Sequence, residues 1–417
     1  MRASLRDLIY SFKNNSSANC FYFTPDQGNF PEYLKKINFD LVVYTTSLIS
    51  ERWRGAETFK TLVTDKIHYL KNIDCVKVVH PQDEWIHTDI LNEFVNEFKI
   101  NYVYTVAPES EWKKIYKQVD FTKVKFTQVL TGYLEDSTIK KVNKIVSNTT
   151  IQNIDIGYRA FRSPPWLGSH GFLKTKIADV FNEKAPAAGF KADISTNEKD
   201  TIAGDDWFKF MARCKYFIGV EGGSTVIDPQ GKIWQNGTDY EKLHPNASFS
   251  DFETNCFPGM DGNLGLIAIS PRQLEAVTAK SCQVLIEGNY NGILKPGIHY
   301  IEIKKDFSNL NEVFQKMKDE SLRIKIVETA YYDIVLSGKY SYKTYTKLIT
   351  ENSLKNIPLK NKKLLDSFYL LKNNMADKTY WSKKQSHSEP NAFTSRNVFN
   401  KLYKYSGLRK VKNSLIK

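Results

Sequence analysis

An arginine and a glutamate stand three positions apart at the start of one predicted helix, where they could bind a phosphorylated sugar or a nucleotide. Arg272 offers a forked cation, which suits a phosphate group. Glu275, one turn further along, could accept two hydrogen bonds from a sugar diol. Free backbone N–H groups at a helix start also favour an anion such as a diphosphate. The same two residues equally fit an ordinary helix with a solvated, charged face.

The segment around these residues, 263–303, has the order strand, helix, strand. Leu264–Ile269 is a short apolar run that ends at Ser270, which begins a Ser-x-x-Gln capping box with Pro271 at the first helical position. A second apolar run, Gln283–Ile286, follows the helix. This order predicts a βαβ unit of a parallel sheet, in which ligands bind at the carboxyl ends of the strands. Those ends carry four candidate ligand residues: Ser270, Arg272, Asn289 and Tyr290.

The segment SPRQLEAVTAKSCQVLIEGNY…GIHYIEI resembles the nucleotide-sugar half of GT-B glycosyltransferases of the group 1 and spore-protein-type families. The resemblance covers residues 150–345 and is fainter before them. In those families a helix-strand pattern places a carboxylate on the nucleotide ribose, and by this match that residue is Glu275. The chain departs from the pattern at Lys280-Ser281, where a small glycine is usual. It also departs at Ile267, where the first glutamate of an E-x7-E pair would stand, so the resemblance supplies no residue there for the donor sugar.

The resemblance implies an α/β fold of the GT-B type, with two Rossmann-like domains, a cleft between them and a helical, basic C-terminal extension. The expected ranges are 1–150 for the acceptor domain, 151–345 for the donor domain and 346–417 for the extension. The implied activity is transfer of a sugar from a nucleotide-sugar donor to a glycan or lipid-linked acceptor in bacterial surface polysaccharide synthesis, with no metal or other cofactor. Two other functions stay open: another GT-B-shaped enzyme, such as an epimerase or a polyol-phosphate polymerase, and a non-catalytic, two-lobed protein that binds a nucleotide or a sugar.

Further donor-binding residues follow from the same resemblance. In such enzymes a basic residue and a lysine after the first strand of the second domain grip the donor diphosphate. Arg159 and Lys174 match them, with Arg162 and His170 as substitutes, and their charge would stabilise the leaving diphosphate. Scattered surface charges are the alternative. The predicted strand Tyr216–Val220 ends in a loop whose glycine pair lets the backbone approach a ligand. That loop begins with three more candidates: Glu221, Gly222 and Gly223.

Alternating strands and helices predict a parallel sheet in the first half of the chain as well. Its predicted strand Cys75–Val79 ends in a polar loop, at the end of a strand where catalytic groups collect. His80, Asp83 and Glu84 in this loop are candidates for a general base toward an acceptor hydroxyl. Asp83 is the choice if the reaction inverts configuration, whereas a retaining reaction needs no such base. The alternative is a helix start whose acidic residues favour the helix dipole.

Composition excludes several classes of protein. Hydrophobic residues make up 41% and charged residues 25% of the chain, as in a globular protein, and no run approaches 18 uncharged apolar residues. The N-terminus lacks the pattern of a signal peptide. Five widely spaced cysteines without a CxxC pair argue for reduced thiols in a cytoplasmic protein and against structural zinc. The absence of GxGxxG and Walker A sequences argues against an NAD dehydrogenase or a P-loop enzyme. Asp205-Asp206 is interpreted as a helix start rather than a metal site.

The net charge of +13 calls for a negatively charged partner. Lysine is spread along the chain and no nucleic-acid motif is present, so we expect no nucleic-acid partner. The excess is heaviest in residues 397–417, which contain no acidic residue and could form a basic amphipathic helix on an anionic membrane. A frayed, solvated tail fits equally well. The expected location is therefore the cytoplasm, with the inner face of the cell membrane as the candidate surface.

Overall fold

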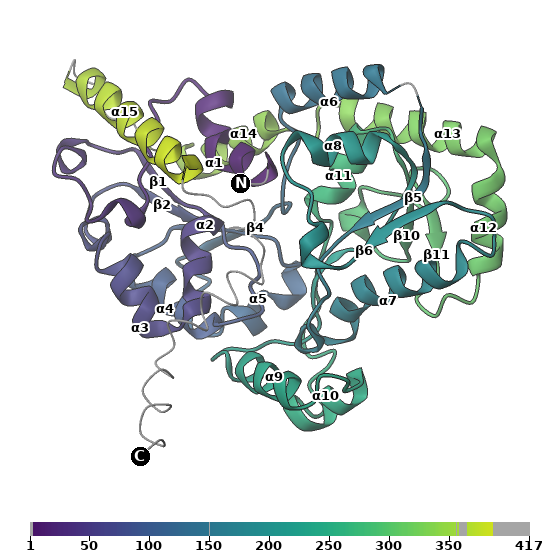
Figure 1. Ribbon diagram of the computed structural model, residues 1–417. Coiled ribbons are helices and arrows are strands. Elements are labelled where there is room, and N and C mark those ends of the chain that lie inside the picture. Colours follow the sequence, from purple (N-terminus) through teal and green to yellow (C-terminus); the bar gives the residue numbers. More distant parts are fainter. Residues whose placement is uncertain (1–2, 150, 356, 358–364, 387–417) are drawn as a thin grey trace.

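The computed structural model describes residues 3–149, 151–355, 357 and 365–386, which form two α/β lobes lying side by side (Figure 1). Each lobe is built around one parallel sheet, so the predicted fold class is confirmed. In the first sheet, neighbouring strands follow one another along the chain. Its order is β1 (Leu41–Tyr44), β2 (Val76–Val79), β3 (Tyr102–Thr105) and β4 (Lys125–Gln128).

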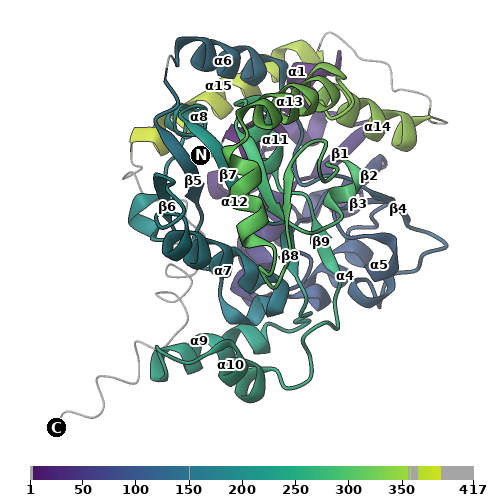
Figure 2. The same cartoon turned by 90° about the vertical axis from the view of Figure 1, so that its right-hand side faces the viewer.

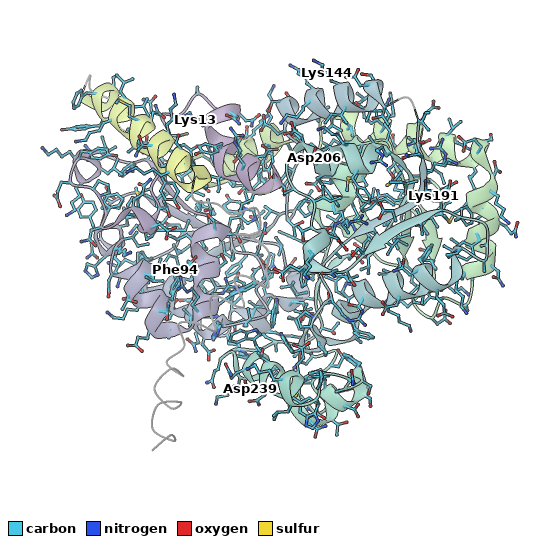
Figure 3. The ribbon with its side chains drawn as sticks, viewed as in Figure 1. Lys13, Phe94, Lys144, Lys191, Asp206 and Asp239 are labelled. Carbon is cyan, nitrogen blue, oxygen red and sulfur yellow. The ribbon has the colours of Figure 1, made fainter. Side chains whose placement is uncertain are left out.

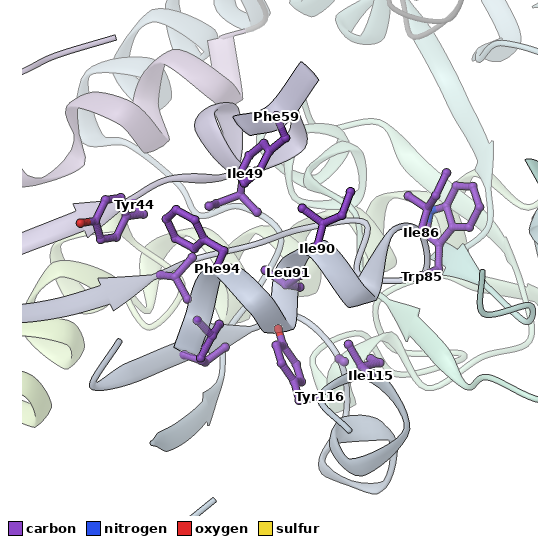
Figure 4. Close-up of a cluster of buried hydrophobic side chains, with 14 of the residues drawn as sticks. Tyr44, Ile49, Phe59, Trp85, Ile86, Ile90, Leu91, Phe94, Ile115 and Tyr116 are labelled. Atoms are coloured by element: carbon purple, nitrogen blue, oxygen red, sulfur yellow. The ribbon is translucent and has the colours of Figure 1, made fainter. Parts of the chain in front are cut away.

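The connections of the first sheet cover only one of its faces. Because the strands progress in one direction and such crossovers are right-handed, the connecting helices all lie on the same side. They include α4 (Thr88–Glu97) and α5 (Glu109–Ile115). On this side Phe94 and Leu91 of α4 belong to a buried apolar cluster that also contains Tyr44 of β1 (Figure 4). Shorter helices join β1 to β2: α2 (Thr46–Ile49), η3 (Ser50–Arg54), α3 (Ala56–Phe59), η4 (Lys60–Thr64) and η5 (His68–Lys71).

The other face of the first sheet is covered by helices from opposite ends of the chain. α1 (Ala3–Asn15) and α14 (Tyr342–Leu354) pack against each other there. Val78 and Tyr104 of the sheet are fully buried in one cluster with Tyr345 of α14. The chain therefore crosses back from the second lobe to the first at α14.

The second sheet has the order β11-β10-β7-β5-β6, and all of its strands are parallel. From β5 the chain moves outward to β6 and then returns past β5 to β7, so the direction of progress reverses between β5 and β7. In open parallel sheets, ligands bind outside the carboxyl ends of the strands at such a reversal. The strands are β5 (Ile154–Arg159), β6 (Ala192–Ser195), β7 (Cys214–Gly219), β10 (Cys282–Ile286) and β11 (Ile301–Ile303).

Helices cover both faces of this second sheet, and α9 and α10 project together from one end of the lobe (Figure 2). α6 packs against α8 and α11, and its Val142 is buried in the core of the second lobe. The chain therefore joins the second lobe before residue 136, although 150 was the expected boundary. The helices are α6 (Asp136–Asn148), α7 (Gly168–Lys184), α8 (Asp205–Ala212), α9 (Lys232–Leu243), α10 (Phe249–Cys256), α11 (Pro271–Thr278), α12 (Leu310–Lys318), α13 (Glu320–Ala330) and η9 (Tyr331–Leu336).

One predicted strand lies outside the parallel sheet. The apolar run before α11 forms β9 (Leu266–Ala268), which pairs in antiparallel fashion with β8 (Gly222–Ser224) and not with the parallel strands. The strand that precedes α11 in the parallel sheet is β7. The predicted βαβ unit beginning at Leu264–Ile269 was therefore wrong in its first strand. This apolar run pairs with β8 in a separate two-stranded sheet and does not join the parallel sheet.

The short apolar run Cys20–Phe23 resembles a strand, but this segment has no regular structure. Its backbone groups bond to a side chain instead. The Tyr22 N–H donates to Asn373 Oδ1 at 2.7 Å, and Asn373 Nδ2 donates to the Tyr22 carbonyl at 2.8 Å. Asn373 belongs to α15 (Leu365–Ser386).

The two lobes are joined by backbone pairing as well as by packing. Ile86 forms an isolated parallel bridge with Asp228, and the Asp228 N–H donates to the Trp85 carbonyl at 2.6 Å. The buried cluster of the first lobe continues through Trp85 and Ile86 into the second lobe. The second-lobe members of that cluster include Trp166, Leu167, Val226, Ile227, Phe252, Phe257 and Leu264.

Among the residues that the structure describes, no helix is long and apolar enough to cross a membrane. The basic segment 397–417, for which the sequence leaves open a membrane-binding helix or a solvated tail, lies outside the described residues.

Candidate functional site

The start of α11 lies at the carboxyl edge of the second sheet and is fixed there by its capping box. The Ser270 N–H donates to Gln273 Oε1 at 2.9 Å, so the predicted box is confirmed. Gln273 Nε2 also donates to the Val220 carbonyl at 3.0 Å, just beyond the end of β7. The helix start is therefore tied to the strand at which the order of the sheet reverses.

Arg272 extends from this helix start toward the end of β5. Its guanidinium carbon lies 5.7 Å from the ring centre of Tyr158 and 5.9 Å from that of Trp207, within the range of cation–π attraction. Within the described part of the chain, Arg272 forms no ion pair with a carboxylate. This places a positive charge between β5 and β7, at the point where an open sheet binds its ligand.

Trp207 joins Arg272 to Glu275. Its Nε1 donates to Glu275 Oε2 at 2.9 Å while its ring lies under Arg272. The indole is held in turn by Phe217 of β7 and Phe210 of α8, whose rings are 5.7 and 6.2 Å away. Sequence analysis missed this role, since the pattern of α8 indicates only that Trp207 lies on its apolar face.

Glu275 also borders the first lobe. It lines a cavity of about 20 Å³ together with Tyr133 and Leu134, which follow β4, and with Asp7 of α1. A cavity of this size holds about one water molecule.

Glu221 is buried, with 3% of its surface exposed, at the carboxyl end of β7. Its carboxylate accepts hydrogen bonds from the backbone N–H groups of Asn289 at 3.1 Å and Tyr290 at 2.6 Å. Burial raises the pKa of this carboxyl group, although the two N–H donors and the charge of Lys305 act in the opposite direction. Gly288 is required here, because a side chain at that position would collide with the Glu221 carboxylate.

Asn289 and Tyr290 meet the site in different ways. Asn289 is exposed, whereas Tyr290 is fully buried and donates its hydroxyl to the Ile286 carbonyl at 2.6 Å. Tyr290 and Asn291 have φ angles of 47° and 54°, so both lie in the left-handed region. Asn291 Oδ1 accepts from the Ile269 N–H at 2.7 Å. The loop after β10 is thus fastened both to Glu221 and to the start of α11.

Positive charge gathers next to Glu221. His170, in the first turn of α7, lies 3.2 Å from the Glu221 carbonyl oxygen through its Nε2. Burial, together with the charges of Lys174 and Lys305, lowers the pKa of His170 to about 4. The imidazole is therefore neutral at pH 7, and the two lysines supply the charge. Lys305 had no place in the sequence analysis, because it follows a strand, β11, that the predicted site did not include.

Arg159, the other predicted diphosphate ligand, is turned toward the edge strand β6. Its guanidinium donates to the Asp193 carboxylate at 2.6 Å and to the Asp193 carbonyl at 2.8 Å. The guanidinium also lies 4.5 Å from the ring centre of Phe210. Arg162 is more exposed and pairs with Asp179 at 3.2 Å.

Gly222 and Gly223 form part of β8 and pair with Ala268 and Ile267 of β9. Gly223 has a φ of 128°, and a side chain there would collide with the backbone of Leu266. The close approach of the two strands therefore accounts for this glycine without a ligand.

The three predicted base residues of the first lobe have different surroundings. Glu84 is fully buried and accepts hydrogen bonds from Thr105 Oγ1, from the Val106 N–H and from the Tyr116 hydroxyl. Burial raises its pKa to about 7. His80 is 1% exposed, and its Nδ1 lies 2.7 Å from the Tyr345 hydroxyl of α14.

Asp83 is exposed and has a φ of 51°. A chain of hydrogen bonds connects its loop to the start of α11. Gln82 Nε2 donates to the Thr131 carbonyl at 2.8 Å, and Thr131 Oγ1 donates to the Ile269 carbonyl at 2.5 Å. The structure therefore brings the loop of Asp83 and the helix start of Arg272 to the same boundary between the lobes.

Among the described residues, no group of three or more His, Cys, Asp or Glu side chains is arranged to hold a metal ion. Asp205 and Asp206 lie in the first turn of α8 and pair with Lys141 and Lys209, respectively. Figure 3 labels Asp206 at this position.

No family model matches the chain, and no curated protein matches it. Solved structures similar to it include HepE (Alr3699) of Anabaena in complex with UDP and glucose, with 12% sequence identity over 75% of this chain and 77% of that chain and a TM-score of 0.39. TarM has 14% identity over 76% of this chain and 56% of that chain, with a TM-score of 0.35. A glycosyltransferase from Rickettsia africae has 11% identity over 77% of this chain and 100% of that chain, with a TM-score of 0.28. With TM-scores this low, the likenesses carry no argument about function.

Proposed function

We propose that the protein is a glycosyltransferase that moves a sugar from a nucleotide-sugar donor to a glycan or lipid-linked acceptor, in the synthesis of a bacterial surface polysaccharide. The observation that carries the proposal is the arrangement of Arg272, Trp207 and Glu275 where the order of the second sheet reverses. One helix start presents a cation for a diphosphate and, one turn later, a carboxylate for a ribose. A single indole side chain holds both groups.

The remaining residues support the same assignment. Lys174 and Lys305 contribute positive charge near His170, and we propose that they stabilise negative charge on a leaving nucleoside diphosphate. With Arg272 they would take the part that a metal ion plays in other transferases, and we propose that the reaction needs no metal. Asp83 would face the acceptor hydroxyl from the first lobe.

We expect a nucleoside diphosphate to raise the melting temperature of the purified chain without added metal. UDP, GDP, CDP, TDP and ADP and their sugars are compared by thermal shift. Ligand at a hundred times its dissociation constant adds about 2.7 kcal/mol of stability.

Arg272→Gln should weaken binding of the active nucleotide about tenfold or more, since a charged hydrogen-bond partner is lost. Trp207→Phe keeps a ring under Arg272 but removes the N–H that holds Glu275, so it should weaken nucleotide binding without weakening pyrophosphate binding.

The matched control is Arg213→Gln. Arg213 is exposed and immediately precedes β7, at the opposite edge of the same sheet. This variant should bind the nucleotide as tightly as the wild type. Absence of a shift with every nucleotide at millimolar concentration would count against the donor site, as would unchanged binding by Arg272→Gln.

A nucleotide-binding protein without catalysis is the second candidate, because only one of the three predicted base residues, Asp83, is exposed. An assay for the release of nucleoside diphosphate distinguishes the enzyme from the non-catalytic binding protein. Its substrate is the sugar nucleotide that binds in the thermal-shift comparison. For an inverting enzyme we expect Asp83→Asn to reduce this turnover about a hundredfold, the lower range for loss of a general base, while nucleotide binding is unchanged. Asp89→Asn, on α4 of the same lobe, is the control. Binding with no turnover by the wild type would favour the non-catalytic protein.

A further inference from the structure

The outward face of α15 carries three large apolar side chains. Phe368, Leu371 and Met375 are 65%, 65% and 71% exposed. Their spacing of three and four residues places them on one side of the helix, on successive turns. Exposed apolar residues that are grouped in this way mark a contact surface, whereas single ones are normal on any protein. We call these three residues the apolar stripe.

The opposite side of α15 is fastened to the first lobe. Asn373 is 2% exposed and exchanges two hydrogen bonds with the backbone of Tyr22, at 2.7 and 2.8 Å. The Tyr10 hydroxyl of α1 donates to Asp377 Oδ2 at 2.7 Å. The helix lies at the periphery of the first lobe (Figure 1), and the exposed apolar stripe is on the side of α15 opposite the buried Asn373.

Lysines flank the apolar stripe on both sides. With about 100° of rotation per residue, Lys372 and Lys383 lie to one side of it and Lys378 to the other. The Nζ of Lys372 lies 4.8 Å from the ring centre of Tyr33, at the edge of the first lobe. Lys13, at the end of α1, donates to Asn374 Oδ1 of α15 at 3.0 Å and adds a fourth cation beside the helix (Figure 3). The chain that continues beyond the described helix, 387–417, contains seven Lys and Arg residues and one Glu. The partner of this surface should therefore be apolar along a line and negatively charged beside it.

We propose that the apolar stripe and its flanking lysines bind the surface of an anionic lipid bilayer. The three apolar side chains enter the boundary between head groups and acyl chains, while the lysines stay at the level of the phosphates. A second copy of the chain fits less well, because it would bring two rows of lysines together. The surface lies on residues other than the basic segment 397–417, and the proposal does not depend on the enzymatic function.

Sedimentation of the full-length protein with vesicles tests this proposal. We expect binding to phosphatidylcholine vesicles that contain phosphatidylglycerol to exceed binding to phosphatidylcholine alone. A stripe variant, Phe368→Ser/Leu371→Ser/Met375→Ser, should bind the anionic vesicles at least about tenfold more weakly. A charge variant is Lys372→Gln/Lys378→Gln/Lys383→Gln. Its affinity for anionic vesicles should fall by up to about fivefold for each lysine replaced. At high salt the wild type and this variant should bind with equal affinity.

The matched control is Tyr332→Ser/Leu336→Ser. These side chains are 70% and 63% exposed, but they belong to η9 of the second lobe. This control should bind vesicles like the wild type, and all variants should keep the wild-type melting temperature. Wild-type affinity of the stripe variant would overturn the proposal, since binding would then reside in the basic segment alone. Equal affinity of the wild type for neutral and anionic vesicles would also overturn it, as would a dimer in light scattering that the stripe variant dissociates.

Discussion

Replacement of Arg52 with methionine is expected to lower the free energy of unfolding by about 4 kcal/mol, measured by chemical denaturation. Arg52 is fully buried, and its guanidinium donates to the backbone carbonyls of Ile49, Gln82, Asp83 and Ile86, at distances of 3.0, 3.2, 2.7 and 3.3 Å. Methionine fills a similar volume but donates no hydrogen bond. Each buried carbonyl that loses its donor retains the cost of leaving water.

The charge of Arg52 adds to this loss. The carboxylates of Asp83 and Glu84 lie near the guanidinium and favour its charged form. Glu84 is itself fully buried, and Arg52 is the cation that acts on its pKa, which burial raises to about 7. Removal of the cation leaves this carboxyl group without a compensating charge, so the loop that carries Asp83 loses both its hydrogen-bond donor and its electrostatic support.

The control for this prediction stands two residues away. Arg54 pairs with Glu51 at 3.1 Å on the surface, with the two side chains 27% and 38% exposed. Because ion pairs at such positions contribute little, Arg54→Met should cost less than about 1 kcal/mol. If Arg52→Met cost no more than this control, the four carbonyls would have other donors, and the role assigned to Arg52 would be wrong.

Local patterns were sufficient to predict most of the elements. β2, β3, β7 and β10 each contain a run of apolar residues, because a strand of a parallel sheet is buried on both faces. β5 (IDIGYR) differs, since its apolar residues alternate with Asp155, Gly157 and Arg159. The start of α11 was also predictable, since a capping box needs only the side chains of Ser270 and Gln273, which are three residues apart. The strand pattern and the capping box together place Arg272, in the first turn of α11, beside the edge of the sheet.

Contacts between distant positions could not be predicted from such patterns. Trp207 and Glu275 are 68 positions apart, and no periodicity within α8 distinguishes an indole that donates a hydrogen bond from one that only packs. Likewise the backbone of Tyr22 is satisfied by Asn373, which is 351 positions away, so a short apolar run that resembles a strand forms none. The burial of Arg52 is a third case, because a charged side chain in a polar segment is normally exposed.

Acidification from pH 6.5 to pH 4 is expected to cost the wild-type protein up to about 3 kcal/mol more stability than the His80→Asn variant. Burial lowers the pKa of His80 from 6.5 to about 4. Between these values the unfolded chain binds a proton at this residue and the folded chain does not, so the free energy of unfolding falls by about 1.4 kcal/mol per pH unit. Above pH 6.5 both states are neutral, and the two stability curves should run parallel. Chemical denaturation of both proteins at a series of pH values measures the difference.

The physical cause of this cost is the contact of His80 with α14. Its Nδ1 lies against the Tyr345 hydroxyl, and its Nε2 is buried without a hydrogen-bond partner in the described structure. Protonation would therefore place an unpaired N–H and a charge beneath the helix that covers the first sheet. Asparagine retains a polar group near the position of Nδ1 but does not titrate. Burial lowers the pKa of His87 and His170 to about 4 as well, and these two residues are present in both proteins, so they cancel in the comparison.

His68 supplies the control, because its side chain is exposed on the surface of the same lobe. His68→Asn should leave the stability at pH 8 unchanged. Parallel curves for the wild type and His80→Asn below pH 6.5 would show that water or a rearranged Tyr345 accommodates the imidazolium, and the packing of α14 would then not depend on a neutral His80. Divergence of the curves below pH 6.5 would identify His80 as a point at which acid weakens the attachment of α14 to the first sheet.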